Sequence, residues 1–114
     1  MANIINLTPH EINLQFENGE EIVHHAFPAS GQVARVSQKS VSAEEIYMDF
    51  YAIPTVENKM GKVEGLPEPS EGTFLIVSSM VQAAAPERAD LLAPGEMIRN
   101  DEGKIIGVKN FKRS

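Results

Sequence analysis

A continuous apolar run, Thr73–Val77, is the feature that most constrains the fold of this chain. A short run without polar alternation is typical of a strand that is buried on both faces. Ser78 and Ser79 follow directly and open a helix-favouring segment that runs to Ala85, so a serine can cap a short helix there. The stretch therefore predicts a buried strand that leads straight into one short helix. Such a junction also presents free backbone N–H groups, which suit an anion.

A second local signal predicts a β-hairpin near the N-terminus. Apolar and polar residues alternate over residues 11–17, which is the period of a half-buried strand. Asn18-Gly19 follows, and this dipeptide favours a two-residue turn because both residues tolerate a positive φ. In that register Glu17 pairs with Glu20, and one face of the hairpin carries most of its apolar side chains.

The rest of the chain offers further short strands. Strands are predicted at residues 4–7, 32–37, 62–64, 97–99 and 105–108, the last two joined as a hairpin. Residues 38–53 are ambiguous, because Ser42 with Glu45 fits a helix capping box whereas the second half alternates like a strand, which we favour. Prolines and glycines make residues 54–72 a long surface excursion around the strand at 62–64.

These elements define the expected fold class. Six to eight short strands with one short helix predict a mainly β (or α+β) domain, in the form of a small antiparallel sandwich or barrel. With 114 residues and neither a linker nor an internal repeat, the chain is expected to form a single globular domain over residues 1–114. Several edge strands in so small a domain favour a homo-oligomer, because pairing covers the edges.

The composition of the chain limits the classes of partner that it can bind. The net charge of −6 argues against nucleic acid, because phosphate binding needs a basic face. The absence of cysteine excludes disulfides and thiolate metal sites and fits a reducing cytosol. The first residues lack the features of a signal peptide, and no apolar run approaches the roughly 20 residues of a membrane span. We therefore expect a soluble cytoplasmic protein without a membrane partner.

Two histidines are candidate ligand-binding residues. In the predicted hairpin register His10 and His25 lie diagonally across one face, with Cα atoms about 7–8 Å apart. Two imidazoles at that distance can share a substrate or a metal ion, but a zinc site needs a third ligand that the sequence does not supply. No metal or other cofactor is therefore predicted. The alternative is a pair of strand histidines that are hydrogen-bonded at a sheet edge.

A second group of candidates could hold an anionic ligand. Its members are Ser78, Ser79, Arg35, Arg88 and Arg99. Hydroxyls and backbone N–H groups at a strand-to-helix junction can hold a phosphate, and arginine can grip one with two hydrogen bonds. The alternative for the serines is plain helix capping, and for the arginines it is surface pairing with the 16 acidic residues.

Six segments together carry a resemblance to known proteins. They are Asn6–His10, Phe27–Val36, Glu64–Thr73, Ile76–Ser79, Arg88–Gly95 and Arg99–Gly107. In these segments the chain resembles a group of small proteins found in tailed bacteriophages and prophages, and the likeness spans most of the sequence. It carries no catalytic residues across.

The resemblance implies a setting, the cytoplasm of a bacterial host during infection, and two non-enzymatic roles. The first is an anti-defence sponge that sequesters a nucleotide-type immune signal of the host, in pockets formed between the subunits of a homo-oligomer. The alternative is a protein–protein inhibitor of a host factor or a virion-associated accessory protein. An enzyme is disfavoured, because no nucleophile, base and stabilising group occur at a recognisable spacing.

Overall fold

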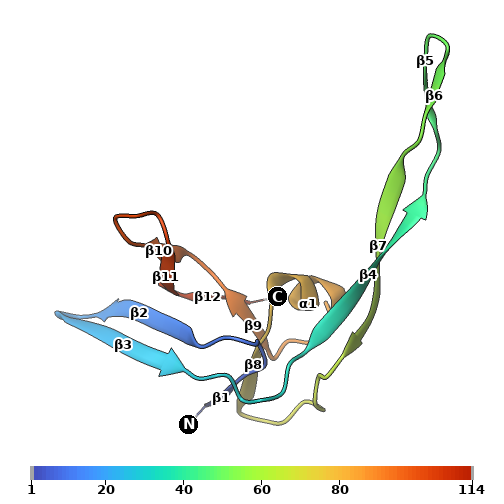
Figure 1. Ribbon diagram of the computed structural model, residues 1–114. Helices are drawn as coiled ribbons and strands as arrows, with labels where there is room; N and C mark the ends of the chain where they lie inside the picture. Colours follow the sequence, from blue (N-terminus) through green and yellow to red (C-terminus); the bar gives the residue numbers. More distant parts are fainter. Residues whose placement is uncertain (1, 114) are drawn as a thin grey trace.

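The core of the protein is a small four-stranded sheet. The computed structural model describes residues 2–113 (Figure 1). The sheet has the order β1-β8-β9-β12, formed by β1 (Asn3–Asn6), β8 (Thr73–Ile76), β9 (Leu91–Pro94) and β12 (Phe111–Arg113). The first three strands are parallel, and β12 is antiparallel to β9. The apolar run that starts at Thr73 thus forms the predicted buried strand, with Ile76 and Val77 fully buried.

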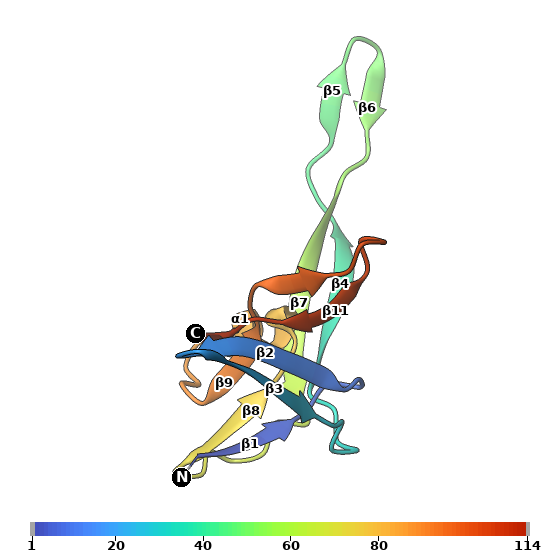
Figure 2. The same ribbon diagram turned by 90° about the vertical axis from the view of Figure 1, so that its left-hand side faces the viewer.

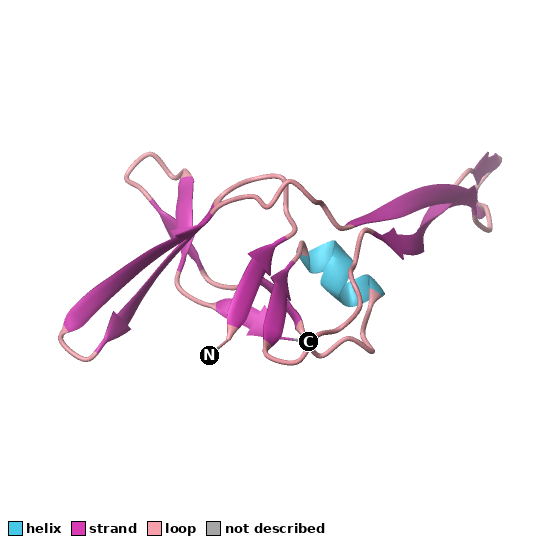
Figure 3. Ribbon diagram, turned by 90° about the horizontal axis from the view of Figure 1, so that it is seen from below, coloured by secondary structure: helices cyan, strands magenta, loops and turns pink. Residues whose placement is uncertain are grey.

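The predicted helix is confirmed as α1 (Ser79–Ala84), the single helix of the described chain. It lies between the core sheet and the base of a long hairpin (Figure 3). Gln82 ties the helix to the sheet, because its buried side-chain amide donates to the carbonyls of Leu91 and Lys112. The apolar core cluster consists of Leu7, Ala34, Leu75, Val77, Val81, Ala85 and Leu91. The core is therefore small and is confined to one part of the molecule.

A second sheet has the order β10-β11-β2-β3. Its strands are β2 (Ile12–Asn18), β3 (Glu21–Phe27), β10 (Met97–Arg99) and β11 (Ile105–Val108). Both predicted hairpins are present, but the predicted register of the first is wrong by two residues. Asn18 pairs with Glu21, so the loop is Gly19-Glu20. Gly19 has a φ of 68° whereas Asn18 stays in the strand, so the glycine alone takes the left-handed position.

Because the slip is an even number of residues, the apolar side chains keep the face that was predicted for them. The diagonal placement of His10 and His25, however, is wrong. His25 pairs with Leu14, whereas His10 lies in the turn before β2.

Residues 35–64 form a long hairpin that we call the arm. Its shaft is β4 (Arg35–Ser42) paired with β7 (Val56–Glu64), and its outer end is β5 (Ile46–Met48) paired with β6 (Tyr51–Ile53). Figure 2 shows the arm projecting away from both larger sheets. The strand interpretation of the second half of residues 38–53 is confirmed. The strand predicted at 62–64 is confirmed as the end of β7, whereas the surface excursion predicted around it is wrong for residues 56–61, which belong to the same strand of the shaft.

The mainly β class with one short helix is confirmed. Residues 2–113 contain twelve short strands rather than six to eight, in four sheets of which none closes into a barrel. The pairing is mixed rather than wholly antiparallel, because β1, β8 and β9 run in parallel. No helix in the described part of the chain has the length and apolar character needed to cross a membrane.

Candidate functional site

The predicted serine pair lies at the start of α1. Ser78 has extended backbone angles, and its hydroxyl accepts a hydrogen bond from the Val81 N–H at 3.2 Å. This is the geometry of an N-cap, in which a side-chain oxygen satisfies one of the free N–H groups of the first turn. Ser79 is the first helical residue, and both serines are exposed. The capping role proposed as the alternative therefore accounts for Ser78.

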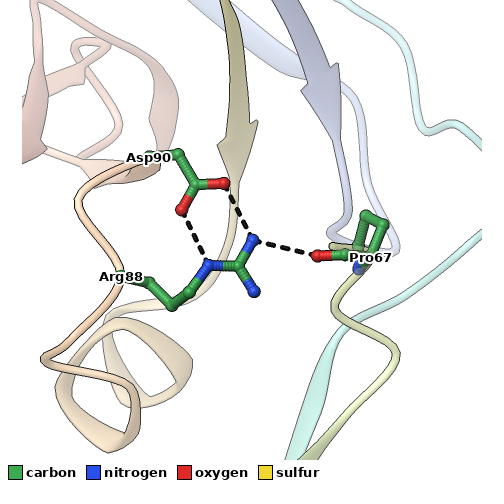
Figure 4. A network of polar contacts seen from close by, with 3 residues as sticks. All are labelled: Pro67, Arg88 and Asp90. Carbon is green, nitrogen blue, oxygen red and sulfur yellow. Dashed lines mark hydrogen bonds and ion pairs between the residues drawn. The ribbon is translucent and has the colours of Figure 1, made fainter. Parts of the chain in front are cut away.

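Arg88 forms a bidentate ion pair with Asp90 (Figure 4). Its Nε and one terminal nitrogen donate to the two carboxylate oxygens at 2.9 and 2.8 Å, and the same terminal nitrogen donates to the carbonyl oxygen of Pro67. The two side chains are only 15% and 16% exposed. The hydrogen bonds from Arg88 lower the pKa of Asp90 against the opposing effect of its burial, and those to Asp90 raise the pKa of Arg88. Arg88 thus joins the loop after α1 to the loop that precedes β8.

Asp90→Asn is expected to lower the free energy of unfolding at pH 7 by about 1–3 kcal/mol, because the substitution leaves the Arg88 charge without its partner. The folded state holds the pKa of Asp90 below its ordinary value of 3.8. The stabilisation is therefore complete above about pH 4 and is lost as the pH falls through the lower, folded pKa. Urea unfolding of both proteins between pH 7 and pH 2 measures this, and the difference between them should vanish at the acid end.

The matched control is Asp101→Asn, at an exposed turn position, which should change the free energy of unfolding by less than about 0.5 kcal/mol. Equal effects of the two substitutions, or a difference that persists at pH 2, would contradict a stabilising Arg88–Asp90 pair.

The two other candidate arginines lie on separate elements. Arg35 is exposed at the base of the arm, where it pairs in register with Glu64. Arg99 ends β10 and donates to the carbonyl oxygen of Gly103 in the adjoining turn. The five anion candidates are therefore spread over the start of α1, the loop after it, the arm base and the β10–β11 hairpin. They do not converge on one point of a single chain.

The histidine candidates have separate surroundings. The ring of His25 packs against Phe27, with centroids 4.4 Å apart. The carbonyl oxygen of His10 accepts hydrogen bonds from the side chains of Asn6 and Thr8. Within residues 2–113 no group of three or more metal-ligating side chains comes together.

The most exposed apolar surface is the arm tip, residues 43–55. Phe50 is 100% exposed and Tyr47 is 78% exposed. The exposed apolar side chains of the tip are Ile46, Tyr47, Met48, Phe50, Tyr51 and Ile53. Both faces of this two-stranded ribbon are therefore apolar and in water. The sequence carries a signal for this exposed surface: seven of the eight residues in 46–53 are apolar or aromatic, so the strand alternation puts apolar side chains on both faces.

A shallow groove crosses the second sheet, and we call it the sheet groove. It consists of two adjoining hollows of about 390 and 430 Å³ that share Gln15 and Ile98. Its apolar lining includes Leu14, Phe16, Ile22 and Ile106, and its polar lining includes His24, His25, Glu17 and Lys109. Ile22 and Ile106 are 57% and 51% exposed. The groove is thus a second apolar surface, on the opposite side of the molecule from the arm.

The molecule is strongly extended. Its radius of gyration is 18.6 Å, against about 13 Å for a compact domain of this length. Its accessible surface is 8539 Å², whereas a compact monomer of 12.5 kDa exposes about 6,200 Å². The chain therefore leaves a large area uncovered that an ordinary monomer would bury.

Comparisons with protein families, with curated proteins and with solved structures found no match to this chain. The functional argument therefore depends on the geometry described above.

Proposed function

We propose that this chain is a non-enzymatic protein-binding protein and that the arm is its binding element. The observation that carries the proposal is the arm tip, where six large apolar side chains are exposed together at the end of a projecting hairpin. Single apolar residues on a surface are ordinary, but a contiguous apolar patch marks an interaction site. Exposed aromatic residues such as Phe50 and Tyr51 are also the kind that dominate the binding energy of protein interfaces.

The shape of the tip supports a protein partner rather than a small molecule. Small ligands bind in concave sites that enclose most of their surface. The tip is a convex ribbon, so it is suited to enter a groove on another molecule. In the bacteriophage setting that the sequence resemblance implies, proteins that such a tip meets include phage-encoded proteins, this chain among them, and host factors in the bacterial cytoplasm.

The nucleotide-sequestering role stays a prediction. It requires a pocket between subunits, to which Ser78, Ser79, Arg35 and Arg99 could contribute from neighbouring chains. Protein binding by the arm is compatible with it, since an assembly must form before such a pocket exists.

Photo-cross-linking tests the proposed function. We expect a benzoylphenylalanine at position 50 to give discrete adducts with protein when the chain is irradiated in a lysate of phage-infected cells, because Phe50 would lie inside the interface. The matched control carries the same group at Glu87, which is exposed on the loop after α1. Mass spectrometry identifies each adduct. No adduct from position 50 above the level from position 87 would contradict the proposal.

A further inference from the structure

We infer that the partner of the arm is a second copy of this chain, with the arm tip of one protomer seated in the sheet groove of another. The inference deepens the proposed function and rests on it. Three observations support it: the area left uncovered, the distribution of charge, and the separation of the tip from the groove.

The uncovered area is large enough for a stable assembly. The chain exposes roughly 2,300 Å² more than a compact monomer of its mass. A standard protein–protein interface buries about 800 Å² on each partner. A protomer that both inserts its tip and receives another tip uses two such areas, which the excess can supply. Association with identical copies would cover this exposed area without the need for a different protein.

Charge sets the orientation of this pairing. The arm tip carries three acidic side chains, Glu44, Glu45 and Asp49, and no basic one. Two charged side chains line the sheet groove, Glu17 in β2 and Lys109 just after β11. Residues 97–109 on the Lys109 side hold three basic side chains against two acidic ones, whereas residues 12–27 on the Glu17 side hold three acidic ones and no lysine or arginine. The acidic flank of an inserted tip should therefore lie toward Lys109 and away from Glu17, which fixes its orientation in the groove.

The tip cannot occupy the groove of its own chain. Figures 1 and 3 show the arm and the second sheet on opposite sides of the molecule, whose longest dimension is 65 Å. The shaft is hydrogen-bonded along β4 and β7, and Val36 and Val63 at its base pack against the core cluster. Folding the arm back would break both. The contact must therefore form between chains, either reciprocally in a closed dimer or head to tail in a ring.

Sedimentation velocity of the purified chain tests the inference. We expect the full chain to be an oligomer, and Phe50→Ser with Tyr51→Ser to weaken association on the order of 100-fold, because both aromatics are removed from the interface. Ile22→Asp should do the same from the groove side, because it replaces an exposed apolar side chain of the groove, paired in register with Glu17, by a second carboxylate. Lys109→Glu is a second groove variant, exposed and fold-neutral, that repels the acidic tip. The control is Met80→Ser, a 43% exposed apolar residue on α1, which should leave the oligomer unchanged.

Mixing the variants gives the decisive result. The tip double variant keeps an intact groove, and the groove variant keeps an intact tip. Each alone should sediment as a monomer, whereas the mixture should form a one-to-one heterodimer through the single contact that remains. A mixture that stays monomeric, or a tip variant that remains oligomeric, would overturn the inference.

The failures of the two proposals are distinguishable. A full chain that is monomeric while position 50 still cross-links a different protein would overturn the second copy as partner and leave the proposed function standing. A monomeric full chain without any position-50 adduct would overturn both. An adduct between two copies of the chain supports both.

Discussion

Asn6→Ala is expected to lower the free energy of unfolding by about 3 kcal/mol, because it removes a buried polar hub. Asn6 is 2% exposed. Its side-chain oxygen accepts from the backbone N–H and the hydroxyl of Thr8, at 2.9 and 2.7 Å. Its side-chain nitrogen donates to the carbonyl oxygens of His10 and Phe27, at 2.8 and 2.9 Å. One amide thus holds the end of β1 to the turn before β2 and to the end of β3.

Alanine removes the acceptor of the buried Thr8 N–H and one donor from each of the carbonyl oxygens of His10 and Phe27, whereas the hydrogen bond from the Thr8 hydroxyl to His10 remains. Each buried group left unsatisfied costs about 1–3 kcal/mol. Urea unfolding followed by circular dichroism, at one fixed protein concentration, gives the value. The control is Asn3→Ala, an exposed asparagine of the same strand, which should change stability by less than about 0.5 kcal/mol. If Asn6→Ala lowers the free energy of unfolding by less than about 1 kcal/mol, the stabilising role of the Asn6 side chain is contradicted.

The elements that the sequence predicts correctly are those with strong local signals. The buried strand at Thr73 follows from an unbroken apolar run, and the helix follows from a serine that can cap it. The first hairpin exists as predicted, but Asn18-Gly19 indicates a turn without indicating which residue begins the loop. Since the glycine alone takes the positive φ, the true pairing is two residues away from the predicted one.

The arm was predicted only in part because it lacks a buried face. A strand that packs on a core alternates between apolar and polar residues, and that alternation is the signal that sequence reasoning uses. Val56–Glu64 has both faces exposed along almost its whole length, so no alternation exists to be found. Pro54 and Gly61 then resemble loop residues, although Gly61 lies within β7 opposite Ser37.

The exposed apolar surface of the arm tip is not predictable from the sequence for a related reason. Apolar and aromatic residues are usually buried, so those of residues 46–53 are expected by default in the core or at its rim. Burial depends on what the rest of the chain places nearby, and nothing else in the described chain covers the tip. Arg88 shows the converse, since its ion pair with Asp90 two residues later has no motif that would set it apart from a ligand-binding arginine.

Removing the arm tip is expected to abolish self-association while the core stays folded. In the proposed variant, Asn-Gly replaces residues 44–54 and joins Ala43 to Thr55. These two residues already pair, because the Ala43 N–H donates to the Thr55 carbonyl oxygen at 2.9 Å, so a two-residue turn can close the shortened hairpin. Val36 and Val63, which pack against the core, remain. The far-ultraviolet circular dichroism spectrum should therefore keep its shape, apart from the contribution of the lost strands.

The melting temperature distinguishes folding from association in this variant. An oligomer is stabilised by mass action, so the Tm of the full chain should rise by roughly 5 °C over a 100-fold increase in concentration. The shortened chain should melt at one temperature throughout that range, because it has no tip to insert. An unfolded variant would show that the tip belongs to the folding unit, and a full chain with a constant Tm would show that no assembly forms. Every side chain of the core cluster lies outside residues 44–54, so we expect neither result. The core cluster stabilises the fold of the single chain, and the arm tip mediates its association.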